Sequence, residues 1–355
     1  MRTTATRPFP HDDRLRKPSR AASHVVRITA ILLALGLLGA CSIRLETPAQ
    51  VEPSPGAVEQ VRARTLDDAT DLAQAAQSAL ATKPSKAVAA VLTDVAEFSD
   101  QHAAQLGPVY DSGLTPSPTA TTAPPASDAA AVLADLADAT RTALADADDV
   151  DDAGLARLVA SIATARDQLT RRLARATGVD TPDLDVVVQP TPAPSPTGSP
   201  APEPTPSPEQ TQAAQSSSAD DLDALVLAHD QAGYAYEVIA AQQSGDVRTQ
   251  ARDAAAAHRD EAQRWAVAAG TAQTKDDPRR AAYTLPDGLT TTRTARRLAV
   301  SLESGIAEAD ATLVARTPAG ERQPFMDGLR TATAAARSWG GAAVAFPGLP
   351  ERAQS

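Results

Sequence analysis

The chain has 355 residues, a formal net charge of −11, one cysteine and only 3% aromatic residues. One thiol excludes an intramolecular disulfide, and an acidic surface repels nucleic acid and anionic lipid head groups, so we expect no nucleic-acid partner. Abundant alanine with few aromatic residues favours close-packed helices, and we expect an all-α fold.

The N-terminus has the order of segments that is typical of a signal peptide. Basic residues between Arg14 and Arg27 precede an uncharged apolar run, Ile28 to Leu38, which is shorter than the roughly 20 residues of a membrane span. The sequence Leu38-Gly39-Ala40-Cys41 resembles the lipobox of bacterial lipoproteins, in which the cysteine receives a lipid and the peptide is cut before it. We therefore expect residues 1–40 to be a signal peptide and Cys41 the lipidation site; an uncleaved anchor is the alternative.

Cleavage before Cys41 would leave a more acidic chain on the outer face of the cell membrane. Residues 1–40 hold seven basic and two acidic residues, so their removal changes the formal net charge from −11 to −16. Residues 41–56 carry three prolines and no apolar period. They are expected to be a tether, which could lift a domain up to ~50 Å from the membrane.

Residues 57–180 contain four patterns with apolar residues at every third or fourth position, as in amphipathic helices. These stripes run from Val58 to Leu80, Val88 to His102, Val132 to Ala147 and Leu155 to Leu173. Pro84 marks the first turn, and Gly178 with Pro182 ends the fourth helix. We expect an N-terminal four-helix bundle here, with His102 as a half-buried histidine at a helix end.

The acidic residues between Asp146 and Asp152 allow two interpretations. They could bind calcium, but the glycine and the closing glutamate of an EF-hand loop are missing. We favour the simpler interpretation, in which Asp151 or Asp152 caps the N-terminus of the fourth helix.

Residues 181–219 form a linker rich in proline, serine and threonine. Proline stands at nearly every second position from Pro190 to Pro208, which favours an extended spacer of roughly 60 Å. A ligand for a proline-binding domain or a site of sugar addition are the alternatives. Because such a spacer buries nothing, cleavage within it is expected to release two separately folding pieces.

Residues 220–350 contain four more helical stripes, which run from Leu222 to Ile239, Ala251 to Ala269, Leu298 to Leu313 and Phe325 to Trp339. In both halves of the chain the second and third helices are separated by about 20 residues, whereas the other connections are short. One long crossover in a four-helix bundle is the ferritin-like layout. We therefore expect two such bundles, joined by the proline-rich linker.

The C-terminal third also resembles a known family in its residues. It contains the runs LAHDQAGYAYEV, AAAAHRDEAQRW, AAYTLPDGL, RRLAVSLESGIAEAD and AARSWGGAAVAFPGLP. Over residues 220–350 these runs resemble an uncharacterised ferritin-like domain of unknown function in actinobacterial lipoproteins. The resemblance implies a fold and no activity.

The ferritin-type di-metal centre cannot be assembled from this sequence. That centre needs a glutamate from each of two helices and a Glu-x-x-His motif from each of the other two. The second C-terminal helix has Ala255 three residues before His258, and no histidine follows His258. In the N-terminal half His102 stands alone, with Ser99 three residues before it.

A smaller metal site remains as an alternative. The helical register brings His229 level with Glu261 and within about one turn of His258, so these three side chains could bind zinc, with Asp230 or Glu237 nearby. The simpler interpretation is that they are hydrogen-bonded polar residues at the edge of an alanine-rich stripe, with His229 and Glu261 paired between helices.

No set of catalytic residues can be recognised. The sequence lacks a glycine-rich phosphate loop before a helix and a Gly-x-Ser-x-Gly elbow, and its one cysteine is assigned to lipid. We expect a non-enzymatic lipoprotein of the cell envelope without a cofactor. It would attach to the membrane through Cys41, and its helical bundles would bind an envelope protein or a cell-wall partner; metal binding through His229, His258 and Glu261 is the alternative.

Overall fold

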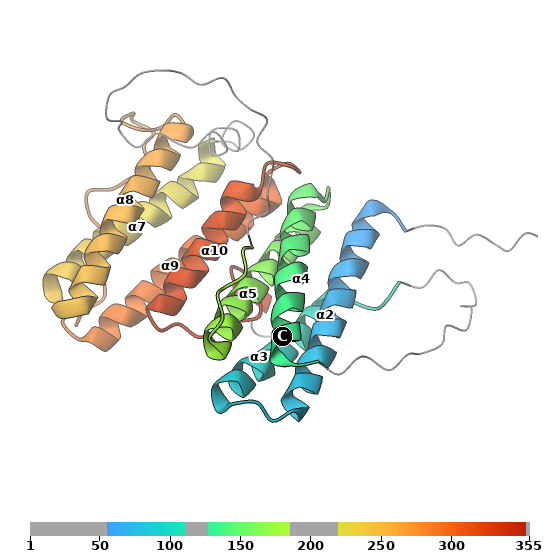
Figure 1. Ribbon diagram of the computed structural model, residues 1–355. Helices are drawn as coiled ribbons and strands as arrows, with labels where there is room; N and C mark the ends of the chain where they lie inside the picture. The colour runs from blue at the N-terminus through green and yellow to red at the C-terminus, as the bar shows by residue number, and fades with distance from the viewer. Residues whose placement is uncertain (1–54, 111–126, 185–218, 353–355) are drawn as a thin grey trace, which may run out of the picture. The chain divides into compact units, whose positions relative to one another are not determined.

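The described residues of the computed structural model are all helical. They comprise residues 55–110, 127–184 and 219–352, and within them lie eight α-helices, one short 3-10 helix and no β-strand (Figure 1). The helices are α2 (Ala57–Ala81), α3 (Lys86–Leu106), α4 (Ala129–Asp149), α5 (Ala153–Thr177), α7 (Ala219–Gln242), α8 (Gly245–Ala268), α9 (Thr292–Arg316) and α10 (Gln323–Ser338), and the 3-10 helix is η2 (Pro350–Arg352). The predicted fold class is confirmed: two groups of four helices follow the sequence periodicity.

The N-terminal bundle consists of two helical hairpins. α2 pairs with α3 and α4 with α5, while α2 also packs on α4 and α3 on α5. Local capping fixes where the helices begin and end. The Asp152 carboxylate accepts a hydrogen bond from the backbone N–H of Leu155 at 2.7 Å, which confirms the predicted N-cap. Gly178 ends α5 in the left-handed conformation, at a φ of 76° that suits glycine.

The C-terminal bundle repeats the arrangement with one difference. α7 pairs with α8, α9 pairs with α10, and α7 packs on α9. The fourth side of the bundle, between α8 and α10, is not closely packed; a cavity lies there instead. The bounds of the helices leave long connections at 107–128 and 269–291, between the second and third helix of each bundle, as predicted.

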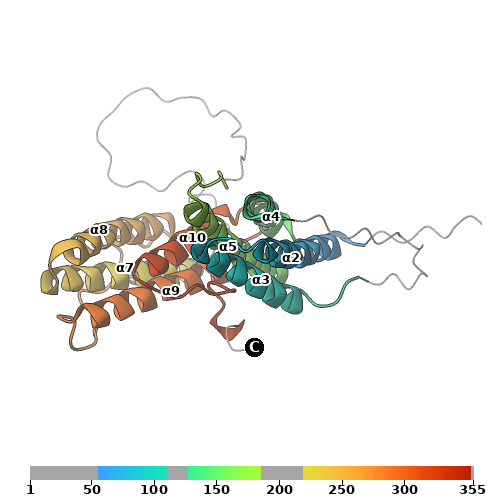
Figure 2. The ribbon, with the colours of Figure 1, turned by 60° about the horizontal axis from the view of Figure 1, so that its bottom comes forward.

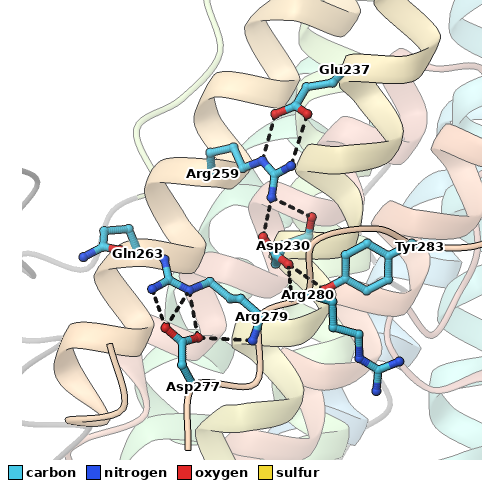
Figure 3. Close-up of polar contacts among 8 residues, drawn as sticks. All are labelled: Asp230, Glu237, Arg259, Gln263, Asp277, Arg279, Arg280 and Tyr283. Atoms are coloured by element: carbon cyan, nitrogen blue, oxygen red, sulfur yellow. Dashed lines mark hydrogen bonds and ion pairs between the residues drawn. The ribbon is translucent and has the colours of Figure 1, made fainter. Parts of the chain in front are cut away.

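The second of these connections is held against α7 and α8 by a polar network (Figure 3). The carboxylate of Asp230, on α7, accepts hydrogen bonds from the backbone N–H of Arg280 at 3.0 Å and from the Tyr283 hydroxyl at 2.6 Å. It also forms an ion pair with Arg259 of α8, which in turn makes a two-pronged contact with Glu237. Asp230 therefore ties two helices and the connection together.

The two bundles share a buried core. α5 packs on both α9 and α10, and it lies beside α10 in both views (Figures 1 and 2). A single cluster of buried apolar side chains includes Leu144 and Ile162 from the first bundle and Leu313 and Met326 from the second. A separate cluster, which contains Leu92 and Leu136, fills the far end of the first bundle.

Hydrogen bonds between residues far apart in the sequence also join the two bundles. The Ser161 hydroxyl donates to the carbonyl of Pro347 at 2.7 Å, and Nε2 of His102 donates to the carbonyl of Ala345 at 2.8 Å. The segment after α10 thus packs along the first bundle. The shared apolar cluster and these hydrogen bonds do not fit the expectation that the two halves fold separately. All the described helices belong to one compact unit, Ser54–Ser355.

Several predictions concern residues outside the described ranges. The signal peptide, Cys41, most of the tether at 41–56 and most of the proline-rich linker at 181–219 lie there. Among the helices that are described, none has the length and apolar character needed to cross a membrane.

Candidate functional site

The side of the C-terminal bundle between α8 and α10 holds a cavity of about 1240 Å³. α7 and α9 contribute to its walls, and α5 of the first bundle borders it through Asp167 and Arg171. Exposed side chains such as Ala257 and Asp327 lie at its rim, so the cavity opens to solvent between the two helices. Its volume is of the order found for sites that bind small organic molecules, roughly 300–1,000 Å³.

Three polar side chains in contact with one another, His229, His258 and Glu303, connect α7, α8 and α9 across the interior. Nδ1 of His229 lies 3.0 Å from Nδ1 of His258, and Nε2 of His258 lies 3.1 Å from Oε1 of Glu303. Since a carboxylate only accepts, Nε2 of His258 carries the proton in this contact. The two Nδ1 atoms share one hydrogen bond, and which of the two rings donates depends on their tautomers.

Burial keeps His229 in its neutral form. The ring is 8% exposed. Burial, together with the neighbouring His258 and the Arg264 guanidinium, lowers the pKa of His229 from 6.5 to about 3. His229 is therefore uncharged at neutral pH.

Tyr236 of α7 contacts two of these three side chains, Glu303 and His258. Its hydroxyl donates to Oε1 of Glu303 at 2.6 Å, and its ring stacks on His258 with 5.4 Å between ring centroids. The other face of the tyrosine packs against Trp339, at 5.5 Å between centroids. Burial and the Glu303 carboxylate raise the pKa of Tyr236, so the phenol stays protonated and remains a hydrogen-bond donor.

Two carboxyl groups in the cavity have an oxygen without a hydrogen-bond partner among the described residues. These are Oε2 of Glu303 and Oδ2 of Asp310, and each side chain is only 1% exposed. Asp310 lies against the backbone of α10, where Gly328 gives it room: a Cβ atom at that position would come within 2.5 Å of the carboxylate. Burial, and to a lesser degree Glu261, raises the pKa of Asp310 well above 3.8.

The remaining acidic side chains in the cavity wall have arginine partners. Glu261 pairs with Arg264 on α8, and Asp167 of α5 accepts from Arg171 at 2.7 Å and from Arg330 at 3.1 Å. Their charges are largely balanced. Among the described acids that line the cavity, those without an arginine partner are therefore Glu303 and Asp310 of α9.

The predicted site is assembled only in part. The structure brings His229 and His258 into direct contact, but Glu261 contacts Arg264 and not a histidine, so the expected pairing of His229 with Glu261 is wrong. Asp230 and Glu237 hold Arg259 and take no part in the cavity. Within the described ranges no three His, Cys, Asp or Glu side chains form a group that could hold a metal ion.

Glu303 and Asp310 were missed in the sequence, although a signal for them exists. The expected apolar stripe of α9 ran through Leu298 and Leu302, whereas the buried face follows Ala295, Ala299, Glu303, Ile306, Asp310 and Leu313. Both acids keep the spacing of three or four residues with Ile306 and Leu313. Acidic side chains are rarely buried unless they have a partner. Two acids at positions that the helical spacing assigns to the buried face therefore indicate a candidate site.

The other candidate residues have structural partners outside the cavity. His102 is fully buried, and not half-buried as expected, beneath the edge of Phe346 with 5.2 Å between ring centroids. In the acidic cluster Asp146 forms an ion pair with Arg64, and Asp148 accepts from the backbone N–H of Arg322 at 2.8 Å. Together with Asp152, which caps α5, three acids of the cluster thus have structural partners.

The C-terminal bundle is similar to one family. Residues 222–351 match the model of a family described as a domain of unknown function, DUF4439. The match begins within the first turn of α7 and ends within η2, so it covers nearly all of the C-terminal bundle and the cavity walls formed by α7 to α10, but not Asp167 and Arg171 of α5. No curated protein and no solved structure matches the chain.

Proposed function

We propose that this protein is a lipoprotein of the cell envelope, anchored through lipid on Cys41, and that its C-terminal bundle is a non-catalytic binding module. The binding site is the cavity between α8 and α10. The lipobox at Leu38-Gly39-Ala40-Cys41 and the apolar run before it support the anchor.

One observation carries the binding proposal: a solvent-open cavity of about 1240 Å³ contains buried carboxyl oxygens that no described residue satisfies. Buried polar groups in folded proteins are almost always hydrogen-bonded, to protein or to something else. A bound molecule would supply the missing partners. The packed walls of α7, α9 and α10 would hold the site open for it, because Tyr236 and Trp339 stack there on the polar residues.

The binding proposal can be tested by the chain's own fluorescence. The protein has two tryptophans, and both Trp265 and Trp339 line the cavity. Small molecules extracted from the envelope would be titrated into the full chain in mild detergent, and tryptophan emission would be recorded. A ligand that enters the cavity should change the emission.

A matched pair of variants locates the response. Ala254 lines the cavity, whereas Ala256, two residues along α8, is exposed outside it. Ala254→Phe should fill the cavity and abolish the response, and Ala256→Phe should preserve it. A response that persists unchanged in Ala254→Phe would put binding elsewhere and contradict the proposal.

Metal binding is the second candidate function, and the contact between His229 and His258 favours it. Two imidazoles 3.0 Å apart, with Glu303 on the second ring, offer ligands that zinc accepts. The residues differ from those expected, since Glu303 takes the place of Glu261. The absence of a third ligand in a suitable position among the described residues makes this the weaker candidate.

A further inference from the structure

The cavity has a charge pattern that indicates the chemistry of its ligand. Glu303 and Asp310 are seven residues apart on α9, which is two helical turns, so they lie on one face about 10.5 Å apart along the helix axis. Ile306 lies between them on the same wall. The cavity wall on α9 is thus an apolar patch with a carboxyl group at each end.

Neither carboxyl group has a lysine or arginine partner within the described residues. Glu303 accepts from the Tyr236 hydroxyl and from His258 on one oxygen only, and Oδ2 of Asp310 has no partner. The arginines that line the cavity, namely Arg171, Arg264 and Arg330, contact other acids. A carboxylate buried in this way is strongly destabilised unless a cation or a hydrogen-bond donor meets it.

An organic ammonium group fits this pattern better than a metal ion. Two carboxyls separated by two helical turns cannot share one ion, and no group of three possible metal ligands is found in the part of the chain that the structure describes. A primary ammonium supplies a positive charge and three N–H donors. The cavity is large enough for an attached carbon chain, which could lie along Ile306, Trp265 and Trp339.

We infer that the cavity binds an organic cation carrying primary ammonium groups, and that Glu303 and Asp310 are the residues that recognise the charge. This inference rests on the proposed function, because it names the ligand class of the same cavity. A linear diamine would engage both carboxyl groups at once. A monoamine would engage one of them, and its carbon chain would cover Ile306.

Calorimetric titration of the full chain in mild detergent tests this inference directly. The probes are linear α,ω-diamines and alkylamines of increasing length, matched with diols, alkanols and alkanoates of the same length. We expect the amines to bind, the diamines to bind more tightly than monoamines of equal length, and the matched alcohols to bind at least tenfold more weakly. Equal affinity for amines and alcohols would overturn the inference.

Three isosteric variants separate recognition from general electrostatics. Glu303→Gln and Asp310→Asn should each weaken diamine binding at least tenfold, while Glu308→Gln, which neutralises an exposed acid on the same helix, should leave it unchanged. Circular dichroism and melting curves would establish that each variant is folded. If Glu303→Gln does not fold, the comparison of Asp310→Asn with Glu308→Gln tests the inference. Equal losses in all three variants would indicate non-specific attraction and contradict the inference.

The inference and the proposed function fail in different ways. If alcohols or alkanoates bind, Ala254→Phe abolishes that binding and no amine binds, the cavity is a binding site but its ligand is not cationic. If amines bind with the same affinity to Ala254→Phe and to the unaltered chain, both ideas are wrong. If no amine binds at any length, the inference is wrong.

Discussion

Nη1 of Arg322, in the turn before α10, lies 2.9 Å from the carbonyl oxygen of Ala147 near the end of α4. The same nitrogen donates to the carbonyls of Asp148 and Val150, at 3.1 and 2.6 Å. Carbonyls at the end of a helix have no partner within the helix. An arginine of the second bundle therefore caps a helix of the first.

We predict that Arg322→Met destabilises the whole protein. The methionine keeps much of the apolar stem but leaves the carbonyls at the end of α4 without a donor, which costs about 1–3 kcal/mol. Denaturant unfolding would measure the change. Arg316→Met is the control, because Arg316 is mostly exposed and pairs with Asp221 at the surface, a contact worth less than about 1 kcal/mol. Equal effects of the two changes would show that the cap is unimportant.

Cleavage of the linker is the second prediction, and it replaces the expectation of two independent pieces. Because Leu144, Ile162, Leu313 and Met326 belong to one buried cluster, separation would expose apolar surface on both sides. A chain cut between Pro190 and Pro208 should therefore elute as one particle and melt in one transition. Two particles with separate transitions would show that the shared core contributes little.

Helix positions could be predicted from the sequence, and the contact between bundles could not. The apolar period of three to four residues reports which face of a helix is buried, and all eight predicted helices are found. It does not indicate which other helix packs against that face. Nothing in the sequence distinguishes Ser161, which meets Pro347, from a serine that faces solvent, because the contact joins residues 186 positions apart.

The candidate site was predicted in part for the same reason. His229 and His258 lie in one helical hairpin, so register alone placed them close together. Glu303 comes from α9, which follows the 269–291 connection, so its contact with His258 depends on the register of α9 against α8. Periodicity within one helix contains no information on that register.

The third prediction concerns acid. Burial lowers the pKa values of His102 and His229 from 6.5 to about 3. Between these two pH values only the unfolded chain takes up the protons, so stability must fall as the pH falls from 6.5. At pH 5 the loss is about 2 kcal/mol for each histidine.

Measuring unfolding free energies at pH 7 and pH 5 tests this prediction. His102→Gln and His229→Gln should each remove about half of the histidine-dependent loss, and the double variant should remove most of it. A pH dependence that stays the same in all variants would show that neither ring stays neutral in the folded state.

The lipid anchor gives the fourth prediction. Cys41 is the only cysteine of the chain, so Cys41→Ala leaves no thiol that could receive lipid. Metabolic labelling with a lipid precursor should mark the unaltered protein and not the variant, and Cys41→Ala should keep its signal peptide uncut. Label in the variant would mean that the lipobox interpretation is wrong. Ser42→Ala, next to the motif, is the control and should be labelled normally.

The last prediction separates a structural histidine pair from a metal site. If His229 and His258 only donate and accept hydrogen bonds, elemental analysis of the purified chain should find no stoichiometric zinc, iron or manganese. Replacing both with glutamine should then change the unfolding free energy at pH 7 by about 1–3 kcal/mol, the range for altered buried hydrogen bonds. A bound metal would give a different result, because its binding free energy adds to folding. One metal per chain, lost in the double variant together with a much larger fall in melting temperature, would establish the metalloprotein alternative. It would also assign the free oxygen of Glu303 to that metal, since this carboxylate already contacts His258.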